Sequence, residues 1–189
     1  QYLSGTTDVT RTMVLGKITD EQRRDFTLVL KANIDMATAV FLKGSSGRTL
    51  DALVREPLWK YHMNYKCGSG HGVGFCLSVH EGPQGFGKDV PLEPGMLLTI
   101  EPGVYKENRY GIRTENTVVV AKDKLDEDAG QFYRFEMLTC CPIDTRGVDA
   151  SLLNRDEIDW LNAYHKNVFN TLSPYLDEQR KGWLKKMTA

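Results

Sequence analysis

The stretch from Cys67 to Pro94 is crowded with glycine, and this density most constrains what the chain can fold into. Glycine reaches backbone conformations that other residues avoid, so we expect irregular, tightly turning chain here. Runs rich in β-branched and aromatic residues follow, separated by turn signals at Pro102-Gly103 and in the acidic loop Leu125–Gly130. The expected strands are Met96–Ile100, Ile112–Ala121 and Phe132–Cys140.

The residues before this stretch predict a strand and a helix. Alternation of side chains over Asp8–Leu15 indicates a strand that places Asp8 on the same side as two threonine hydroxyls. A capping-box pair, Thr19 and Gln22, begins an apolar stripe at helical spacing that extends to about Lys43.

Two further helical regions are expected. The first should begin at Thr49 and run to His62, with Pro57 kinking or shortening it. The second should begin with a capping box formed by Asn154 and Glu157, and a short basic helix should follow it. Helices on one face of an antiparallel sheet make the expected fold class α+β.

Composition places the chain in the ordinary globular class and excludes several kinds of partner. Of its 189 residues 41% are hydrophobic and 26% charged, which is enough for one buried core. Lys and Arg total 24 against 25 Asp and Glu, so neither nucleic acid nor a membrane surface is an expected partner. The first residues lack a signal-peptide pattern. The four cysteines lack zinc-site spacing and are expected to be reduced, buried thiols.

Five side chains are candidate residues of a metal site, in which carboxylates and one imidazole would bind the metal. His71 and His80 lie in the glycine-rich stretch, Glu101 and Glu115 lie in or beside the strands that follow, and Asp8 lies far upstream. Carboxylate oxygens with imidazole bind Mn²⁺, Co²⁺ or Zn²⁺ in hydrolytic centres. Each residue alone also fits an ordinary surface histidine or an exposed strand carboxylate. The combination indicates a hydrolytic metal site.

Glu101 and Glu115 should approach each other if the strands that carry them form a hairpin. Two carboxylates at close range repel, and a divalent cation between them is a common remedy. Arg113 stands two residues before Glu115, hence on the same face of that strand, where it is placed to hold Glu115 or to meet a substrate carbonyl.

Four motifs in this order resemble the pita-bread metallopeptidases, and most closely the aminopeptidase P (Xaa-Pro aminopeptidase) family. The resemblance covers nearly the whole chain, including the segment that ends in IDWLNAYH. The motifs are GTTDVTRT, GSGHGVGFCLSVHEGP, LEPGMLLTIEPGVY and GIRTEN.

The resemblance implies a site for two divalent metal ions, usually Mn²⁺, with Co²⁺ or Zn²⁺ as alternatives. In it Asp8 and Glu115 would bridge the two ions, and His71 and Glu101 would bind one of them. His80 would hydrogen-bond the substrate and stabilise the tetrahedral intermediate.

The same resemblance gives Arg113 the role of supporting Glu115.

Two departures from the family pattern stand out. Relatives carry a further metal-binding aspartate upstream of Asp8, and this chain begins too late to include it. Many relatives also have a histidine where this chain has Cys67. The first departure predicts weak metal occupancy and little activity in this chain alone; the second affects a substrate contact and not metal binding.

The fold implied is a curved antiparallel sheet with helices on its outer face. Residues 1–189 would form a single catalytic domain, incomplete at its N-terminal side. Within it, residues 1–145 would supply the metal-site sheet and helices, and residues 146–189 the C-terminal helices. A chain that opens on Gln1, without methionine, agrees with a fragment.

The implied reaction releases the N-terminal residue from peptides whose second residue is proline. A hydroxide held by the metals would attack the carbonyl, while Glu101 takes a proton from water and His80 stabilises the oxyanion. Arg113 completes the expected catalytic set. The alternatives are a prolidase acting on Xaa-Pro dipeptides and a pita-bread binding module without catalysis. The resemblance also implies a cytoplasmic homodimer with peptide substrates.

Overall fold

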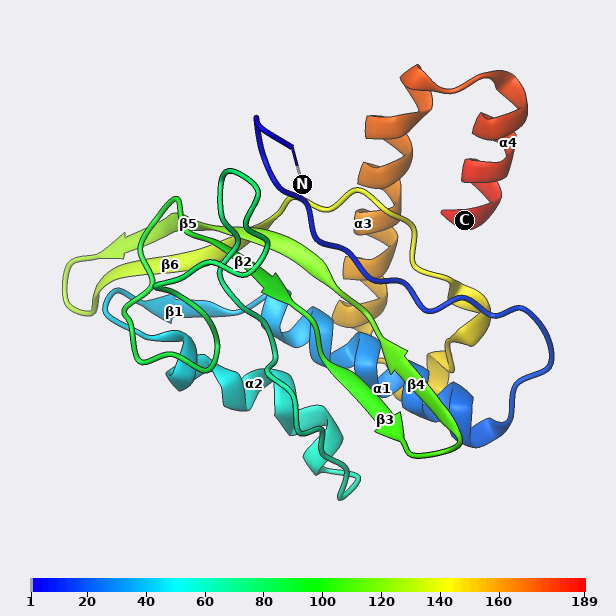
Figure 1. The fold of residues 1–189 in the computed structure, drawn as a ribbon, viewed down its shortest axis with the longest axis horizontal. Helices are drawn as coiled ribbons and strands as arrows, with labels where there is room; N and C mark the ends of the chain where they lie inside the picture. The colour runs from blue at the N-terminus through cyan, green and yellow to red at the C-terminus, as the bar shows by residue number, and fades with distance from the viewer. Residues whose placement is uncertain (1) are drawn as a thin grey trace. The chain divides into compact units, whose positions relative to one another are not determined.

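The computed structural model describes residues 2–189 and combines helices with antiparallel strands (Figure 1). The α+β class expected from the sequence is confirmed. The helices are α1 (Asp20–Ala37), α2 (Gly47–Trp59), α3 (Arg155–Leu172) and α4 (Glu178–Met187), with 3₁₀ turns η1 (Thr145–Gly147), η2 (Ala150–Leu152) and η3 (Ser173–Tyr175). The strands are β1 (Val40–Leu42), β2 (Leu97–Ile100), β3 (Gly103–Lys106), β4 (Tyr110–Arg113), β5 (Asn116–Asp126) and β6 (Gly130–Met137).

The chain divides into two compact units. One comprises the residues up to Thr10 together with Val29–Thr139, and the other comprises Arg11–Leu28 and Cys140–Ala189. The second half of helix α1, from Val29, therefore belongs to the first of these units, and its first half belongs to the second. The single catalytic domain expected over residues 1–189, with its division after residue 145, stays a prediction.

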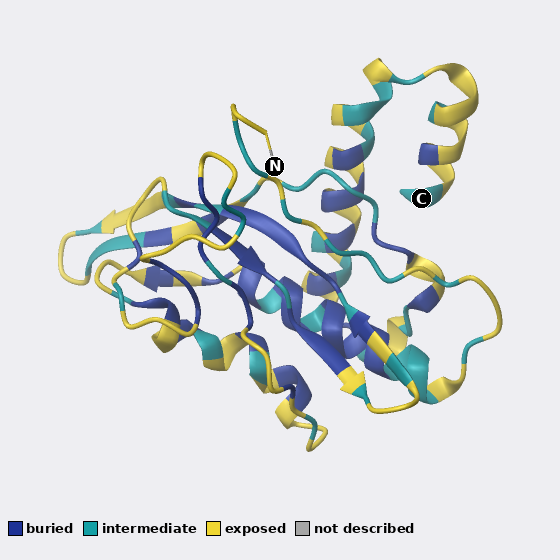
Figure 2. Ribbon diagram, in the orientation of Figure 1, coloured by how far each residue is buried: buried dark blue, intermediate teal, exposed yellow. Residues whose placement is uncertain are grey.

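A four-stranded antiparallel sheet in the order β1-β6-β5-β2 organises the first unit. Strand β5 pairs with β6 on one edge and with β2 on the other, in a register that places Ile100 opposite Asn116. The inward side chains Leu98, Ile100 and Val118 have no exposed surface. Figure 2 shows these central strands as part of the buried core. Burial of this apolar surface fixes which face of β2 and β5 is turned inward.

The first helix ends earlier than the sequence predicts. It stops at Ala37 and not near Lys43, because Val40–Leu42 forms strand β1 and pairs with β6. In this strand Phe41 packs on Phe135 at a ring-centroid distance of 5.0 Å. Tertiary pairing has therefore overridden a local helical pattern.

The second helix is shifted relative to the prediction. Its N-cap is Ser46 and not Thr49, because the Ser46 hydroxyl accepts a hydrogen bond from the Thr49 N–H at 3.3 Å. It ends at Trp59, two residues after Pro57, and does not reach His62.

Two strand predictions were wrong in detail. Residues 8–15 do not form a regular strand; an isolated bridge joins Thr10 to Glu115 instead. The expected strand Ile112–Ala121 is in fact two strands, β4 and β5, and β4 pairs with β3 in the register that pairs β5 with β2. The break comes at Glu115, where the N-terminal segment replaces the neighbouring strand as partner.

Helix α3 dominates the second unit. Its capping box forms as expected: Glu157 N–H donates to the Asn154 side chain at 2.9 Å, and Asn154 N–H donates to the Glu157 carboxylate at 2.8 Å. The apolar stripe is buried at Leu161, Tyr164 and Val168. The Arg11 guanidinium donates to the Cys141 carbonyl at 2.9 Å and to the Tyr164 hydroxyl at 2.8 Å, which ties the segment before η1 to α3.

The cysteines differ from expectation in their burial. All four are free, but Cys67 and Cys76 are exposed, and Cys140 and Cys141 are half-buried. The prediction of buried thiols was therefore wrong. Separately, none of the helices formed by residues 2–189 is both long and apolar enough to cross a membrane.

The capping box of α3 gives a stability test. Asn154→Ala removes the acceptor of the Glu157 N–H, and we expect the free energy of unfolding to fall by about 1 kcal/mol. Urea unfolding followed by circular dichroism measures it. Asn162→Ala, on the exposed face of the same helix, is the matched control and should be neutral or slightly stabilising. Equal losses in both variants would contradict a capping role.

Candidate metal centre

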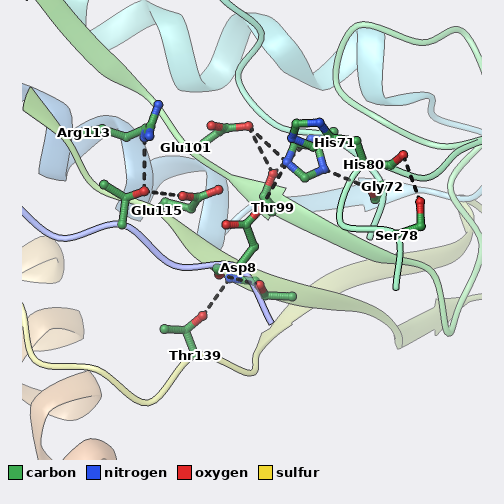
Figure 3. A network of polar contacts seen from close by, with 12 residues as sticks. Asp8, His71, Gly72, Ser78, His80, Thr99, Glu101, Arg113, Glu115 and Thr139 are labelled. Carbon is green, nitrogen blue, oxygen red and sulfur yellow. Dashed lines mark hydrogen bonds and ion pairs between the residues drawn. The ribbon is translucent and has the colours of Figure 1, made fainter. Parts of the chain in front are cut away.

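Four chain segments lie side by side in the first unit, and each brings one candidate ligand (Figure 3). The glycine-rich loop brings His71, the end of β2 brings Glu101, the start of β5 brings Glu115, and the N-terminal segment brings Asp8. All four line one cavity of about 500 Å³, together with His80. The rest of the lining consists of Thr10, Cys67, Gly68, Gly70 and Arg113. The structure therefore brings every sequence-predicted site residue together.

His71 is held against the free edge of β2. Its carbonyl accepts a hydrogen bond from Thr99 N–H at 2.9 Å, and its own N–H donates to the Thr99 hydroxyl at 3.0 Å. A Cβ atom on the preceding Gly70 would lie 1.9 Å from the Thr99 carbonyl oxygen, so only glycine permits this approach. Sequence reasoning missed Thr99, although its place two residues before Glu101 puts it on the same face of the strand.

Glu101 and Glu115 lie opposite each other in one long hairpin. Strands β2 and β5 are neighbours, and their pairing runs up to Ile100 opposite Asn116. The same register continues from β3 to β4, where Gly103 lies opposite Arg113, and it places Glu101 opposite Glu115. The expected approach of the two carboxylates and the expected hairpin are confirmed, but the chain reverses between Lys106 and Tyr110 and not at Pro102-Gly103.

The backbone of each glutamate has a different partner. Glu101 N–H donates to the Ser69 carbonyl at 2.8 Å, and Glu115 N–H donates to the Thr10 carbonyl at 3.0 Å. The N-terminal segment is fixed a second time, because the Thr117 hydroxyl donates to the Asp8 carbonyl at 2.8 Å. Both outer segments are therefore anchored to the sheet next to the carboxylates.

The ligand atoms are spaced as around a single cation. The His71 Nε2 atom lies 3.4 Å from Asp8 Oδ2 and 3.5 Å from Glu101 Oε1. Ligand atoms bound at about 2.1 Å to one cation lie roughly 3.0–3.4 Å apart. The Nδ1 atom of His71 lies 2.9 Å from the Gly72 carbonyl oxygen, which can only accept. In the neutral imidazole Nδ1 therefore carries the proton, and the lone pair of Nε2 is the one that can bind a metal.

A second grouping includes His80. Donor atoms of Asp8, His71 and His80 lie within 4.8 Å of one another, as do those of His71, Glu101 and Glu115. The rings of His71 and His80 meet edge-on with centroids 4.0 Å apart. His80 is exposed at the mouth of the cavity, where it can reach a substrate.

Arg113 supports Glu115 through an intervening hydroxyl that sequence reasoning did not single out. Arg113 Nε donates to the Thr10 hydroxyl at 3.1 Å, and that hydroxyl donates to Glu115 Oε2 at 2.5 Å. The Tyr105 hydroxyl accepts from Arg113 on the other side at 3.3 Å. The signal for Thr10 was present, because it was expected on the same side of the chain as Asp8.

The charge of the cavity fits divalent cations. Burial raises the pKa of Glu115, and the charges of Glu101 and Asp8 raise it further, while the Thr10 hydrogen bond lowers it. Among the described residues that line the cavity, the guanidinium of Arg113 faces these three carboxylates as the one permanent cation. Added positive charge would favour the ionised carboxylates, and oxygen ligands with one imidazole suit Mn²⁺, Co²⁺ or Zn²⁺.

Comparison with known proteins gives matches along the chain. Residues 1–122 match the model of metallopeptidase family M24, and residues 131–189 match that of the C-terminal region of peptidase M24. The chain is 46% identical to a probable Xaa-Pro aminopeptidase P of Neurospora crassa and 42% identical to aminopeptidase P1 of Arabidopsis thaliana. The whole chain is covered in both cases, but it spans only 29% and 30% of those proteins.

Solved structures are similar as well. X-prolyl aminopeptidase from Caenorhabditis elegans, described as a cytosolic enzyme with a di-nuclear active site, matches 98% of this chain with a TM-score of 0.91 and 42% identity. The match covers 31% of that protein. Xaa-Pro dipeptidase from Bacillus anthracis matches 73% of this chain and 36% of its own, with a TM-score of 0.58 and 30% identity. The resemblance indicated by the sequence motifs is confirmed.

The role of the Thr10 hydroxyl, which lies between Arg113 and Glu115, can be tested with Thr10→Val. This variant keeps the shape of the side chain and removes both hydrogen bonds. We expect Mn²⁺ affinity, measured by isothermal titration calorimetry, to weaken about tenfold, because Glu115 loses a hydrogen bond to its charged form. Thr7→Val, at an exposed position in the same segment, should leave the affinity unchanged. Unaltered binding by Thr10→Val would show that Glu115 does not depend on this hydroxyl.

The raised pKa of Glu115 predicts a pH dependence of stability in chelator-treated protein. Above the unfolded-state pKa near 4.5, the folded state holds more protons than the unfolded state, so the stability contributed by protonated Glu115 falls as pH rises through the folded pKa. Glu115→Gln stays neutral and should lack this fall. Urea unfolding between pH 4.5 and pH 7 should therefore show the variant gaining stability relative to wild type, whereas a constant difference would contradict the raised pKa.

Proposed function

The chain belongs to metallopeptidase family M24 and has the pita-bread fold, and on this premise we propose that the natural protein containing it is a metal-dependent aminopeptidase. It would release the N-terminal residue from peptides with proline in second position. The observation that carries this proposal is the convergence of Asp8, His71, Glu101 and Glu115 on one cavity. The names of its relatives support the substrate class.

Four side chains would supply the donor atoms for the cations. These are His71, Glu101, Asp8 and Glu115, and the assignment of Asp8 and Glu115 to both ions rests on the resemblance to aminopeptidase P. When bound, the cations lower the pKa of water and stabilise negative charge on the scissile carbonyl oxygen. The di-nuclear site of the similar Caenorhabditis elegans enzyme supports the number of ions.

Residues of the chain supply the remaining steps. Glu101, whose carboxylate lines the cavity 3.5 Å from His71 Nε2, would take a proton from the attacking water. His80, exposed at the cavity mouth, would donate a hydrogen bond to the oxygen on which charge develops. Arg113 and Thr10 would keep Glu115 oriented toward the cavity through their paired hydrogen bonds.

Proline specificity is supported by the names of the relatives and by the chemistry of the bond. The nitrogen of an Xaa-Pro bond carries no hydrogen, so a site that requires a donor there would reject it. A cavity of about 500 Å³ has room for a dipeptide-sized portion of substrate. In this proposal the site cleaves the peptide bond that precedes proline.

Three further properties belong to the proposal. The ion would be Mn²⁺, supported by the three carboxylates that accompany one imidazole. The protein would be cytoplasmic, as is stated for the similar Caenorhabditis elegans enzyme. It would act as a homodimer, which rests on the resemblance to aminopeptidase P alone.

Substrate length and sequence separate the proposal from a prolidase. For the natural protein loaded with Mn²⁺, we expect kcat/KM for an Xaa-Pro-Yaa-Yaa peptide to exceed that for the Xaa-Pro dipeptide and for Xaa-Ala-Yaa-Yaa at least tenfold. Glu101→Gln should lower the rate more than a thousandfold, because it removes both a metal ligand and the proton acceptor. The exposed-loop control Glu127→Gln should match wild type.

Preference for the dipeptide would move the assignment to prolidase. Absence of turnover in the Mn²⁺-loaded natural protein would favour the non-catalytic binding module. The expectation that these 189 residues alone have little activity is tested by the same assay on the isolated chain.

The role of His80 can be separated from metal binding. His80→Ala should lower kcat roughly a hundredfold while Mn²⁺ affinity stays within about twofold of wild type, because the side chain acts on the oxyanion and not on the ion. His62→Ala, an exposed histidine outside the cavity, is the control. A parallel loss of Mn²⁺ affinity would instead make His80 a ligand with Asp8 and His71.

A further inference from the structure

A fully buried amide lies in the second half of α1, beneath the metal-site strands. Asn33 has no exposed surface, and its neighbours Ala32 and Ile34 are buried as well. Asparagine is a poor helix former, and a buried amide without partners costs free energy. A position of this kind calls for specific hydrogen bonds.

Those hydrogen bonds all go to the residues that flank the two glutamates. The Asn33 amide nitrogen donates to the Ile100 carbonyl at 2.9 Å and to the Thr114 carbonyl at 3.2 Å. The Asn33 side-chain oxygen accepts from the Asn116 amide at 2.8 Å. Ile100 precedes Glu101, and Thr114 and Asn116 flank Glu115.

The two carbonyls belong to the peptide groups that lead into the glutamates. In the peptide group between Ile100 and Glu101, Asn33 holds the oxygen and the Ser69 carbonyl holds the N–H at 2.8 Å. In the peptide group before Glu115, Asn33 again holds the oxygen, and the Thr10 carbonyl holds the N–H at 3.0 Å. Because a peptide group is planar, fixing both ends fixes its orientation.

This bracing occurs where the ladder between the two strands lacks a donor. The register that pairs Ile100 with Asn116 resumes at Gly103 opposite Arg113, and between these pairs Thr114 N–H donates to the Pro102 carbonyl at 3.4 Å. Pro102 has no N–H to donate to the Thr114 carbonyl, and the Asn33 amide donates to that carbonyl instead.

We propose that Asn33 is a positioning residue that sets the separation and direction of the Glu101 and Glu115 carboxylates for metal binding. It touches neither metal nor substrate; it acts through the two peptide groups. The inference rests on the proposed function in so far as these glutamates are metal ligands. A metal-free structural measurement tests the bracing itself.

The experiment compares three variants in the natural protein that contains this chain. Asn33→Leu removes every hydrogen bond of the amide at similar volume. Asn33→Asp keeps an acceptor for Asn116 and loses the NH₂ group that serves both carbonyls, so it remains informative if the leucine variant does not fold. Thr27→Val is the matched control: its buried hydroxyl donates to Arg23 O at 2.8 Å and accepts from Asp149 N–H at 2.8 Å, in the other half of the same helix.

Two readouts are expected to change together. Mn²⁺ affinity by isothermal titration calorimetry should weaken at least tenfold in both Asn33 variants and stay within twofold in Thr27→Val. Hydrogen exchange of the Glu101 and Glu115 amides in chelator-treated protein should quicken at least tenfold in the Asn33 variants alone, because the peptide groups that carry these amides are no longer held at their oxygens.

Other outcomes overturn the inference. Wild-type affinity or unchanged amide exchange in the folded Asn33 variants would remove the positioning role while leaving the proposed function intact. An equal loss of affinity in Thr27→Val would make the effect one of general stability. A wild-type protein that does not bind Mn²⁺ would overturn the proposed function, and the inference about metal ligands with it.

Discussion

The antiparallel pairing of β2 with β5, whose last regular pair is Ile100 opposite Asn116, is the constraint on which the site depends. Up to that point the two strands share a fully buried apolar face, so their register cannot slip by one residue without exposing it. One step beyond it the next residues are Glu101 and Glu115. The register that buries the core therefore also sets two acidic side chains next to each other.

The ends of this pairing are completed by chain from elsewhere in the first unit. The glycine-rich loop lies along β2 and delivers His71, and the N-terminal segment lies along the start of β5 and delivers Asp8. Neither segment is a regular strand. Hydrogen bonds hold both segments against the sheet. In the glycine-rich loop, Gly70 also allows the backbone to lie close to β2.

This arrangement also concentrates negative charge in the cavity. Several carboxylates crowd a partly buried cavity, and burial together with mutual repulsion raises the pKa of Glu115. Repulsion among these carboxylates costs free energy in the metal-free protein, and bound divalent cations would offset that repulsion. The neutral bracing groups, the Thr10 hydroxyl and the Asn33 amide, orient the carboxylates without neutralising them.

Much of this site could be predicted from the sequence, and the reasons are specific. Glycine and proline punctuate the motifs that carry the ligands, and capping-box spacing located the starts of α1 and α3. The local sequence pattern predicted the wrong secondary structure where residues distant in the sequence determine it. Phe41 reads as part of a helical stripe and is a strand residue because β6 is there to pair with it.

Other features left too little local signal. Ser46 and Thr49 are equally good caps by type, and only the packed structure separates them. Asn33 reads as an unremarkable helix residue, because its importance comes from carbonyls far along the chain.

The most direct test of the account is a crystal of the natural protein containing this chain, soaked in Mn²⁺ and measured at a wavelength where manganese scatters anomalously. The account predicts an anomalous peak in the cavity about 2.0–2.3 Å from His71 Nε2 and from carboxylate oxygens of Asp8, Glu101 and Glu115. Mn²⁺ found only at other positions, with these four side chains making no contact to it, would contradict the central claim.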